Sequence, residues 1–185
     1  MNKFHRPAKW ASFPQSSTVA VTSYAELRTD AVRYMARLWH ELRGSGAMPE
    51  RSALNPRDFA AFARDVSLIR VVEGGRDYEF RIIGDAHVQA YRATDQGRLL
   101  SEIAAQTPNF GSWLKGTYDR VRTSGKPLCL QGQVGSEFDH APFGWFESGN
   151  FPLGTGERDS PSVSHILTVA VYAERPPETN CMMII

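Results

Sequence analysis

The sequence predicts an α+β domain built on a five-stranded antiparallel sheet. Segments of strand composition occur in a two-plus-three order, and residues 85–124, which lie between the two groups, have helical character. A helix with one apolar face precedes all of them. Both faces of a sheet need apolar cover, so we expect the helical insertion on one face and the N-terminal helix on the other.

The N-terminal helix is the first regular element that the sequence predicts. Residues 1–23 show no hydrophobic period and are predicted to form a flexible arm. Thr22 or Ser23 is the expected cap, because Glu26 follows Ser23 at capping-box spacing, and Gly44 marks the end. The apolar face covers either the chain's own sheet or the same helix of a second copy. The candidate interface residues on this face are Met35, Leu38, Trp39 and Leu42.

The remaining elements follow from turn residues and local periodicity. Asn55 and Pro56 predict the start of a second, shorter helix. Gly74-Gly75 joins strands 66–72 and 78–83 into a hairpin. Within the insertion we expect short helices near 86–91 and 99–105, and a longer one from Pro108 to Gly125. Strands 127–134, 144–153 and 164–172 complete a domain that spans residues 24–175, and residues 176–185 form a tail.

Composition excludes several classes of protein. The 185 residues suit one domain, and 21 basic against 20 acidic residues leave a net charge of +1, so no overall field favours nucleic acid. No segment resembles a signal peptide or is long and apolar enough to cross a membrane. Cys129 and Cys181 form no CxxC pair, and Cys129 is expected to be a buried thiol. A cytoplasmic protein without disulfides is the expectation.

Catalytic and metal-binding motifs are not found. The five histidines form no HxH or HExxH pattern and no Cys/His ligand spacing, so no metal site is expected. The chain contains neither a G-x-S-x-G nucleophile motif nor a P-loop. We therefore do not expect an enzyme. The five histidines are His5, His40, His87, His140 and His165.

A set of spaced motifs resembles one protein family. Trp39-x-x-Leu42-Arg43 is followed by Met48-Pro49-x-Arg51, by Pro56 and by Tyr78-x-Phe80-Arg81-x-x-Gly84. Together with the strand order, these motifs resemble the single-PAS family common in alphaproteobacteria, over about residues 34–174. The resemblance implies a sensory or signalling module, in which N-terminal helices often mediate homodimers. Haem- and flavin-binding members need a histidine or a cysteine motif that residues 109–124 and the rest of this chain lack, so no cofactor is expected.

The resemblance also implies a ligand pocket between the insertion and the central strands. Two possibilities remain open: the aromatic residues there fill the core, or they enclose a small apolar ligand. Arg81 and Gln131 are candidate polar contributors, although their faces depend on strand register. The candidate pocket residues are Arg81, His87, Tyr91, Phe110, Trp113, Tyr118, Gln131 and Phe146.

The function expected from these observations is non-enzymatic. The protein would bind a small ligand or a signalling protein and transmit that state through its N-terminal helix. An alternative is a pocket enzyme of the nuclear-transport-factor-like type, using an acid or a histidine for proton transfer. A third possibility is a structural dimerisation domain with a filled core.

Overall fold

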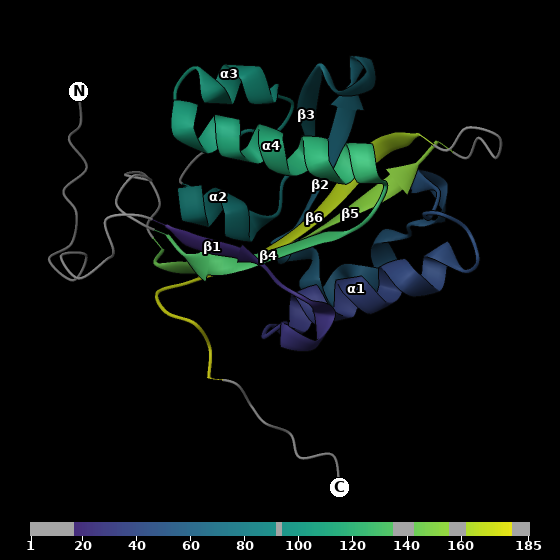
Figure 1. Ribbon diagram of the computed structural model, residues 1–185, viewed down its shortest axis with the longest axis horizontal. Coiled ribbons are helices and arrows are strands. Elements are labelled where there is room, and N and C mark those ends of the chain that lie inside the picture. The colour runs from purple at the N-terminus through teal and green to yellow at the C-terminus, as the bar shows by residue number, and fades with distance from the viewer. Residues whose placement is uncertain (1–16, 92–93, 135–142, 156–161, 179–185) are drawn as a thin grey trace, which may run out of the picture.

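All six strands of the computed structural model belong to one antiparallel sheet, in the order β1-β4-β5-β6-β2-β3 (Figure 1). The structure describes residues 17–91, 94–134, 143–155 and 162–178. The five predicted strands and their placement in a single sheet are confirmed. The strands are β1 (Thr18–Val21), β2 (Val66–Val72), β3 (Asp77–Ile82), β4 (Leu128–Gln133), β5 (Trp145–Gly154) and β6 (Val163–Ala173).

Strand β1 is the element that the sequence prediction missed. Residues 1–23 were expected to form a flexible arm, but Thr18–Val21 pair with β4, from Thr18 opposite Gln133 to Val21 opposite Leu130. The close approach depends on a glycine in β4, because a Cβ atom on Gly132 would lie 2.3 Å from the carbonyl oxygen of Thr18. Residues 1–16 of that arm, and residues 179–185 of the predicted tail with Cys181, lie outside the described residues.

The helices follow the predicted order with one changed boundary. Ser23 and Glu26 do form a capping box, but only the 3₁₀ turn Tyr24–Glu26 follows it, and α1 begins at Asp30. Asn55 caps the 3₁₀ helix η4 by accepting a hydrogen bond from the Arg57 amide. Helix α4 begins at Pro108 and ends before Gly125, which adopts φ of 62°, as the sequence predicted. The bounds are α1 (Asp30–Arg43), η4 (Pro56–Asp65), α2 (Asp85–Tyr91), α3 (Leu100–Ala104) and α4 (Pro108–Ser124).

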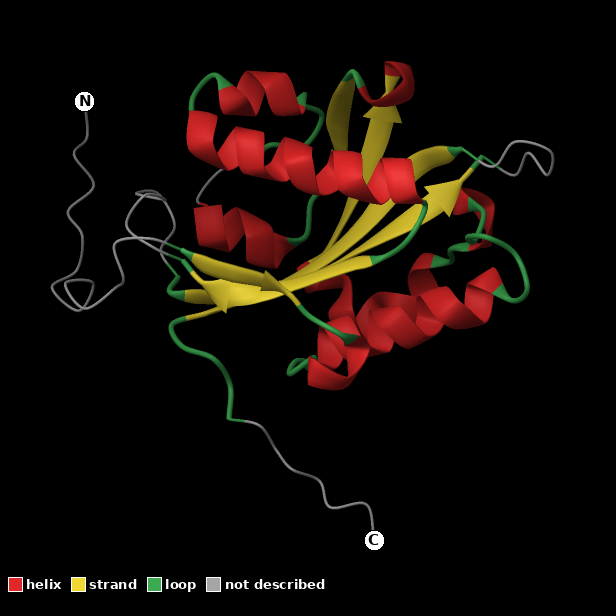
Figure 2. Cartoon of the chain, in the orientation of Figure 1, coloured by secondary structure: helices red, strands yellow, loops and turns green. Residues whose placement is uncertain are grey.

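Helices cover both faces of the sheet (Figure 2). Helix α1 packs on one face, and the insertion that carries α2, α3 and α4 lies across the other. Side chains of β5 alternate between the two layers: Phe146 belongs to the core under the insertion, and Phe151 to the core under α1. All ten residues of β5 are therefore buried. None of the helices in the described part of the chain is long and apolar enough to cross a membrane.

The apolar face of α1 packs against its own sheet. Met35 is fully buried, Trp39 is 3% exposed and Leu38 is 9% exposed within the single chain. Leu42 is half-buried at the edge of the same core. The sequence left open whether this face covers the chain's own sheet or a second copy. Within the single chain, Met35, Leu38 and Trp39 pack on the sheet of the same protomer, as the first alternative predicts, and a dimer interface at Leu42 and its neighbours stays a prediction.

Buried polar contacts fix the position of α1 on the sheet. The indole nitrogen of Trp39 donates a hydrogen bond to the carbonyl oxygen of Pro152 at 2.8 Å. At the start of the helix, the fully buried carboxylate of Glu147 accepts hydrogen bonds from the backbone amides of Arg28 and Thr29, at 2.7 and 2.8 Å. The Thr29 hydroxyl donates a third, at 2.5 Å. Because these amides bind a strand residue, the chain turns at Arg28 and Thr29, and α1 starts later than its periodicity suggested.

Candidate ligand cavity

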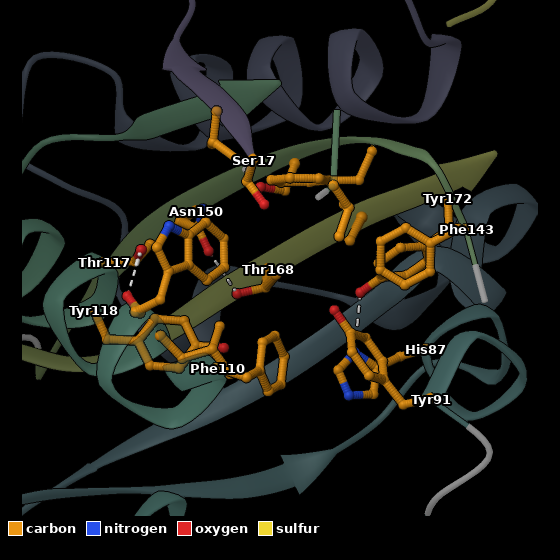
Figure 3. A pocket seen from close by; sticks show the side chains of 17 residues that line it. Ser17, His87, Tyr91, Phe110, Thr117, Tyr118, Phe143, Asn150, Thr168 and Tyr172 are labelled. Carbon is orange, nitrogen blue, oxygen red and sulfur yellow. Dashed lines mark hydrogen bonds between the residues drawn. The ribbon is translucent and has the colours of Figure 1, made fainter. Parts of the chain in front are cut away.

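A cavity of about 60 Å³ lies between the sheet and the helical insertion. Helices α2 and α4 supply one wall, and β5 and β6 supply the opposite wall. Figure 3 shows the labelled side chains of these elements pointing toward a common space. The lining residues are Ser17, Val19, His87, Tyr91, Phe110, Trp113, Leu114, Thr117, Tyr118, Val134, Phe143, Phe146, Ser148, Asn150, Thr168, Ala170 and Tyr172.

Most of the residues that the sequence nominated for a pocket line this cavity. They are His87, Tyr91, Phe110, Trp113, Tyr118 and Phe146. Helical spacing brings His87 and Tyr91 to the same face of α2, and their ring centroids are 4.6 Å apart.

Arg81 and Gln131 lie on the other face of the sheet. Arg81 is exposed and pairs with Glu79 at 2.8 Å, whereas Gln131 donates a hydrogen bond to the Thr22 hydroxyl at 3.1 Å. Their neighbours Phe80 and Leu130 face the insertion instead. Successive residues of a strand point to opposite faces, so neither polar side chain contributes to the cavity.

Aromatic rings from both walls, on α2 and α4 and on or beside β5 and β6, surround the cavity. Tyr91 lies at their centre, with ring centroids 4.7 Å from Phe110, 5.5 Å from Phe143 and 5.7 Å from Tyr172. Trp113 packs edge-on against Phe146 at 5.7 Å. Edge-to-face and offset contacts of this kind favour a fixed arrangement of rings, which gives the cavity a defined shape.

Polar side chains on β5 and β6 also line the cavity, and they were not among the residues nominated from the sequence. The Thr168 hydroxyl donates to the side-chain oxygen of Asn150 at 3.0 Å, and the Asn150 amide donates to the carbonyl oxygen of Leu128 at 3.2 Å. Ser148 lies two residues before Asn150 on the same face of β5. The sequence does carry a signal for these residues, since polar side chains recur at every second position of a buried strand. A purely apolar core would not contain them, so their spacing could have indicated a polar patch in the cavity wall.

His87 and Tyr172 meet inside the cavity. The Nδ1 atom of His87 lies 3.0 Å from the Tyr172 hydroxyl. Burial lowers the pKa of His87 to about 4, so the imidazole is neutral at physiological pH. Burial likewise raises the pKa of Tyr91, Tyr118 and Tyr172 above the usual range. The cavity is therefore uncharged, which suits a neutral ligand. Among the described residues, no group of three or more His, Cys, Asp or Glu side chains is arranged to hold a metal ion.

The size of the cavity limits what it can hold in this conformation. Pockets for drug-sized ligands span roughly 300–1,000 Å³, and an engineered apolar cavity of about 150 Å³ admits benzene. At about 60 Å³ this cavity is smaller than either. It can accept water or a ligand of a few heavy atoms, and a larger ligand requires the insertion to move away from the sheet.

Comparisons with known proteins do not identify a relative. The chain matches no protein-family model, no curated protein and no solved structure.

Proposed function

We propose that this protein is a PAS-like sensory module that binds a small, neutral, largely apolar ligand in the cavity and transmits the bound state to α1. The arrangement of elements supports this proposal. The hairpin of β2 and β3 joins the last strand, β6, in one sheet, and the insertion with α2, α3 and α4 lies across one face. This is the arrangement that the resemblance to the PAS family implies.

The observation that carries the proposal is the shared use of two strands. Residues 148 and 150 of β5, and 168, 170 and 172 of β6, line the cavity. The alternate residues of the same two strands face α1, including Phe151 on β5 and Leu167 and Val169 on β6. A displacement of either strand by a ligand therefore changes the surface on which α1 rests.

The size of the cavity indicates how occupancy would be transmitted. A ligand as large as a benzene ring does not fit in the observed conformation, so it would select conformations in which the insertion has moved outward. The movement that we propose is that of the helices α2, α3 and α4 relative to the sheet. Residues 92–93, which follow α2, lie outside the described residues and take no part in the proposal. The ligand would shift the population of two packings of helix on sheet, and α1 would report that shift to a partner.

The two alternative functions have less support from the geometry. A pocket enzyme would require an acid–base group in the cavity. Among the described lining residues, His87 is the one titratable side chain besides the tyrosines. Its imidazole is held neutral by burial and contacts Tyr172. A dimerisation domain would require an apolar surface, whereas the α1 face packs inward. We therefore propose ligand binding without catalysis.

The proposal is tested by titration of the protein with benzene, indole and methanol while amide NMR spectra are recorded. We expect shifts at cavity residues such as Ala170 and Asn150, together with altered hydrogen exchange in α1. Ala170→Val is the matched variant, because Ala170 is 7% exposed and two added methyl groups would occupy the cavity. This variant should retain the fold and lose the response. Ala53→Val, an exposed position outside both the cavity and α1, is the control and should retain the response.

Two outcomes would contradict the proposal. If none of the three ligands perturbs the cavity residues, the cavity is simply part of a filled core. If a ligand binds but leaves exchange in α1 unchanged, ligand binding stands and transmission through α1 fails.

A further inference from the structure

A second hollow lies at one end of the sheet, separate from the cavity. It is a groove of about 720 Å³ bounded by the C-terminal ends of α1 and α4. Figure 1 shows both helices ending toward the same side of the sheet, one on each face. Met48 bridges the two layers, because it packs against both the core under the insertion and the core under α1. A volume of this size falls within the range of roughly 300–1,000 Å³ that small-molecule sites occupy.

The charged side chains of the groove are all basic. Arg43 reaches it from α1, Arg122 from α4, and Lys126 from the turn after α4, and His40 adds an imidazole. No aspartate or glutamate is found among the described residues that line it. Lys126 is exposed, and Arg43 and Arg122 are partly buried. The groove therefore carries a concentration of positive charge in a protein with a net charge of only +1.

Both guanidinium groups have a donor that lacks an acceptor. The Nε atoms of Arg43 and Arg122 are shielded from solvent and make no hydrogen bond within the described structure. The guanidinium of Arg43 lies over the Trp39 ring, 5.7 Å from its centroid. Arg122 lies 3.7 Å from Asp119, whose carboxylate is already bound by Lys115 at 2.8 Å and by the Tyr78 hydroxyl at 2.6 Å. These Nε atoms are closed to solvent, so an anion in the groove would bind the terminal NH groups of the two arginines instead. Arg43 has no acidic partner at ion-pair distance among the described residues, and an anion in the groove would supply one.

The backbone holds Arg122 in this position. A Cβ atom on Gly75 would lie 2.1 Å from the Arg122 Nε atom, so the side chain crosses a place that only glycine leaves open. Gly75 also adopts φ of 100°, a conformation that suits glycine. Apolar side chains, namely Trp39, Met48, Pro127 and Val163, line the rest of the groove. The site thus combines positioned cationic donors with an apolar wall.

We propose that this groove binds a small organic anion, a molecule that carries a phosphate or carboxylate group on an apolar body. Arg43, Arg122 and Lys126 would bind the oxyanion, since guanidinium groups match its geometry with paired donors. The apolar body would pack against Trp39 and Met48. This inference is independent of the ligand proposed for the cavity, because the two sites share no lining residue.

The experiment is calorimetric titration of the full chain at low ionic strength with phenyl phosphate, phenylacetate, inorganic phosphate and benzyl alcohol. We expect saturable binding of one or both aromatic anions, weaker binding of inorganic phosphate and none of the neutral alcohol. Arg43→Gln and Arg122→Gln should each weaken binding by about tenfold or more, because each removes a charge-assisted donor. Lys126→Gln changes an exposed residue, so it tests the site even if an arginine variant folds poorly. Comparison of phenyl phosphate with phenylacetate assigns the oxyanion.

Matched controls separate a site from general attraction. Arg37→Gln lies on α1 and Arg120→Gln on α4, and both residues are exposed and absent from the groove. These variants should bind as the unmodified protein does. Equal weakening by control and groove variants would overturn the proposal, as would the absence of anion binding. Binding of inorganic phosphate as tight as that of phenyl phosphate would refute the role of the apolar wall.

Discussion

The buried carboxylate of Glu147 offers a direct test of what positions α1. It receives the amides of Arg28 and Thr29 and the Thr29 hydroxyl, and it is completely buried in the middle of β5. Its negative charge also lies beside the N-terminus of α1, where the helix dipole favours an anion. Glu147→Gln keeps the size of the side chain and replaces one acceptor oxygen with an NH₂ group, which cannot bind the two backbone amides and can donate only to the Thr29 hydroxyl.

The expected loss of stability follows from the hydrogen bonds. A hydrogen bond to a charged group contributes about 1.5–3 kcal/mol and a neutral one about 0.5–1.5 kcal/mol. The glutamine oxygen can serve only one side of the site, so at least one charged bond is lost and the others weaken. Burying an amide costs less than burying a charge, which offsets part of the loss. We expect Glu147→Gln to lower the free energy of unfolding by about 2–4 kcal/mol, or the Tm by about 5–15 °C for a chain of this length.

The assay combines urea unfolding with amide hydrogen exchange. In the unmodified protein the amides of Arg28 and Thr29 should be protected, and in Glu147→Gln they should exchange faster together with the first turn of α1. Glu41→Gln is the control, because Glu41 is exposed on the same helix and should change stability by less than about 0.5 kcal/mol. A loss of less than about 1 kcal/mol in Glu147→Gln, with unchanged protection of Arg28 and Thr29, would refute the reasoning.

Three further predictions concern other buried groups. Trp39→Ala should lower the free energy of unfolding in urea by about 3–5 kcal/mol, because it empties a core site and removes the hydrogen bond to Pro152. Light scattering should show an unchanged mass. Dissociation of a dimer instead would mean that the α1 face lies between protomers. The pKa of His87 is depressed to about 4, so between pH 6.5 and 4 the unfolded chain binds more protons than the folded one, and stability should fall as pH falls through that window. In melting experiments at several pH values, His87→Gln should reduce the dependence of Tm on pH. An unchanged dependence would exclude His87 as its source. Burial and the nearby Glu147 raise the pKa of the Cys129 thiol to about 12, so iodoacetamide should modify it only after unfolding; peptide mass spectrometry that finds Cys129 alkylated in the native protein at pH 8 would contradict this.

Local patterns in the sequence predicted most of the secondary structure, because the information lies within a few residues. Pro108 and Gly125 mark the two ends of α4, since proline suits the first turn and glycine accepts the left-handed conformation after the last. The apolar runs on either side of Gly74-Gly75 predicted β2 and β3 for the same kind of reason. The apolar spacing of Met35, Leu38 and Trp39 predicted a buried helix face without indicating what would cover it.

Tertiary structure decided the features that depend on partners distant in sequence. Thr18–Val21 is too short to form a strand alone, and it is ordered by β4 and by the space above Gly132. Register decided that Arg81 and Gln131 point away from the cavity while Asn150 and Thr168 point into it, and a shift of one residue would reverse both. The start of α1 depends on Glu147, which follows Arg28 by 119 positions. Local propensity carries no information about such contacts, because they arise only when the sheet brings distant segments together.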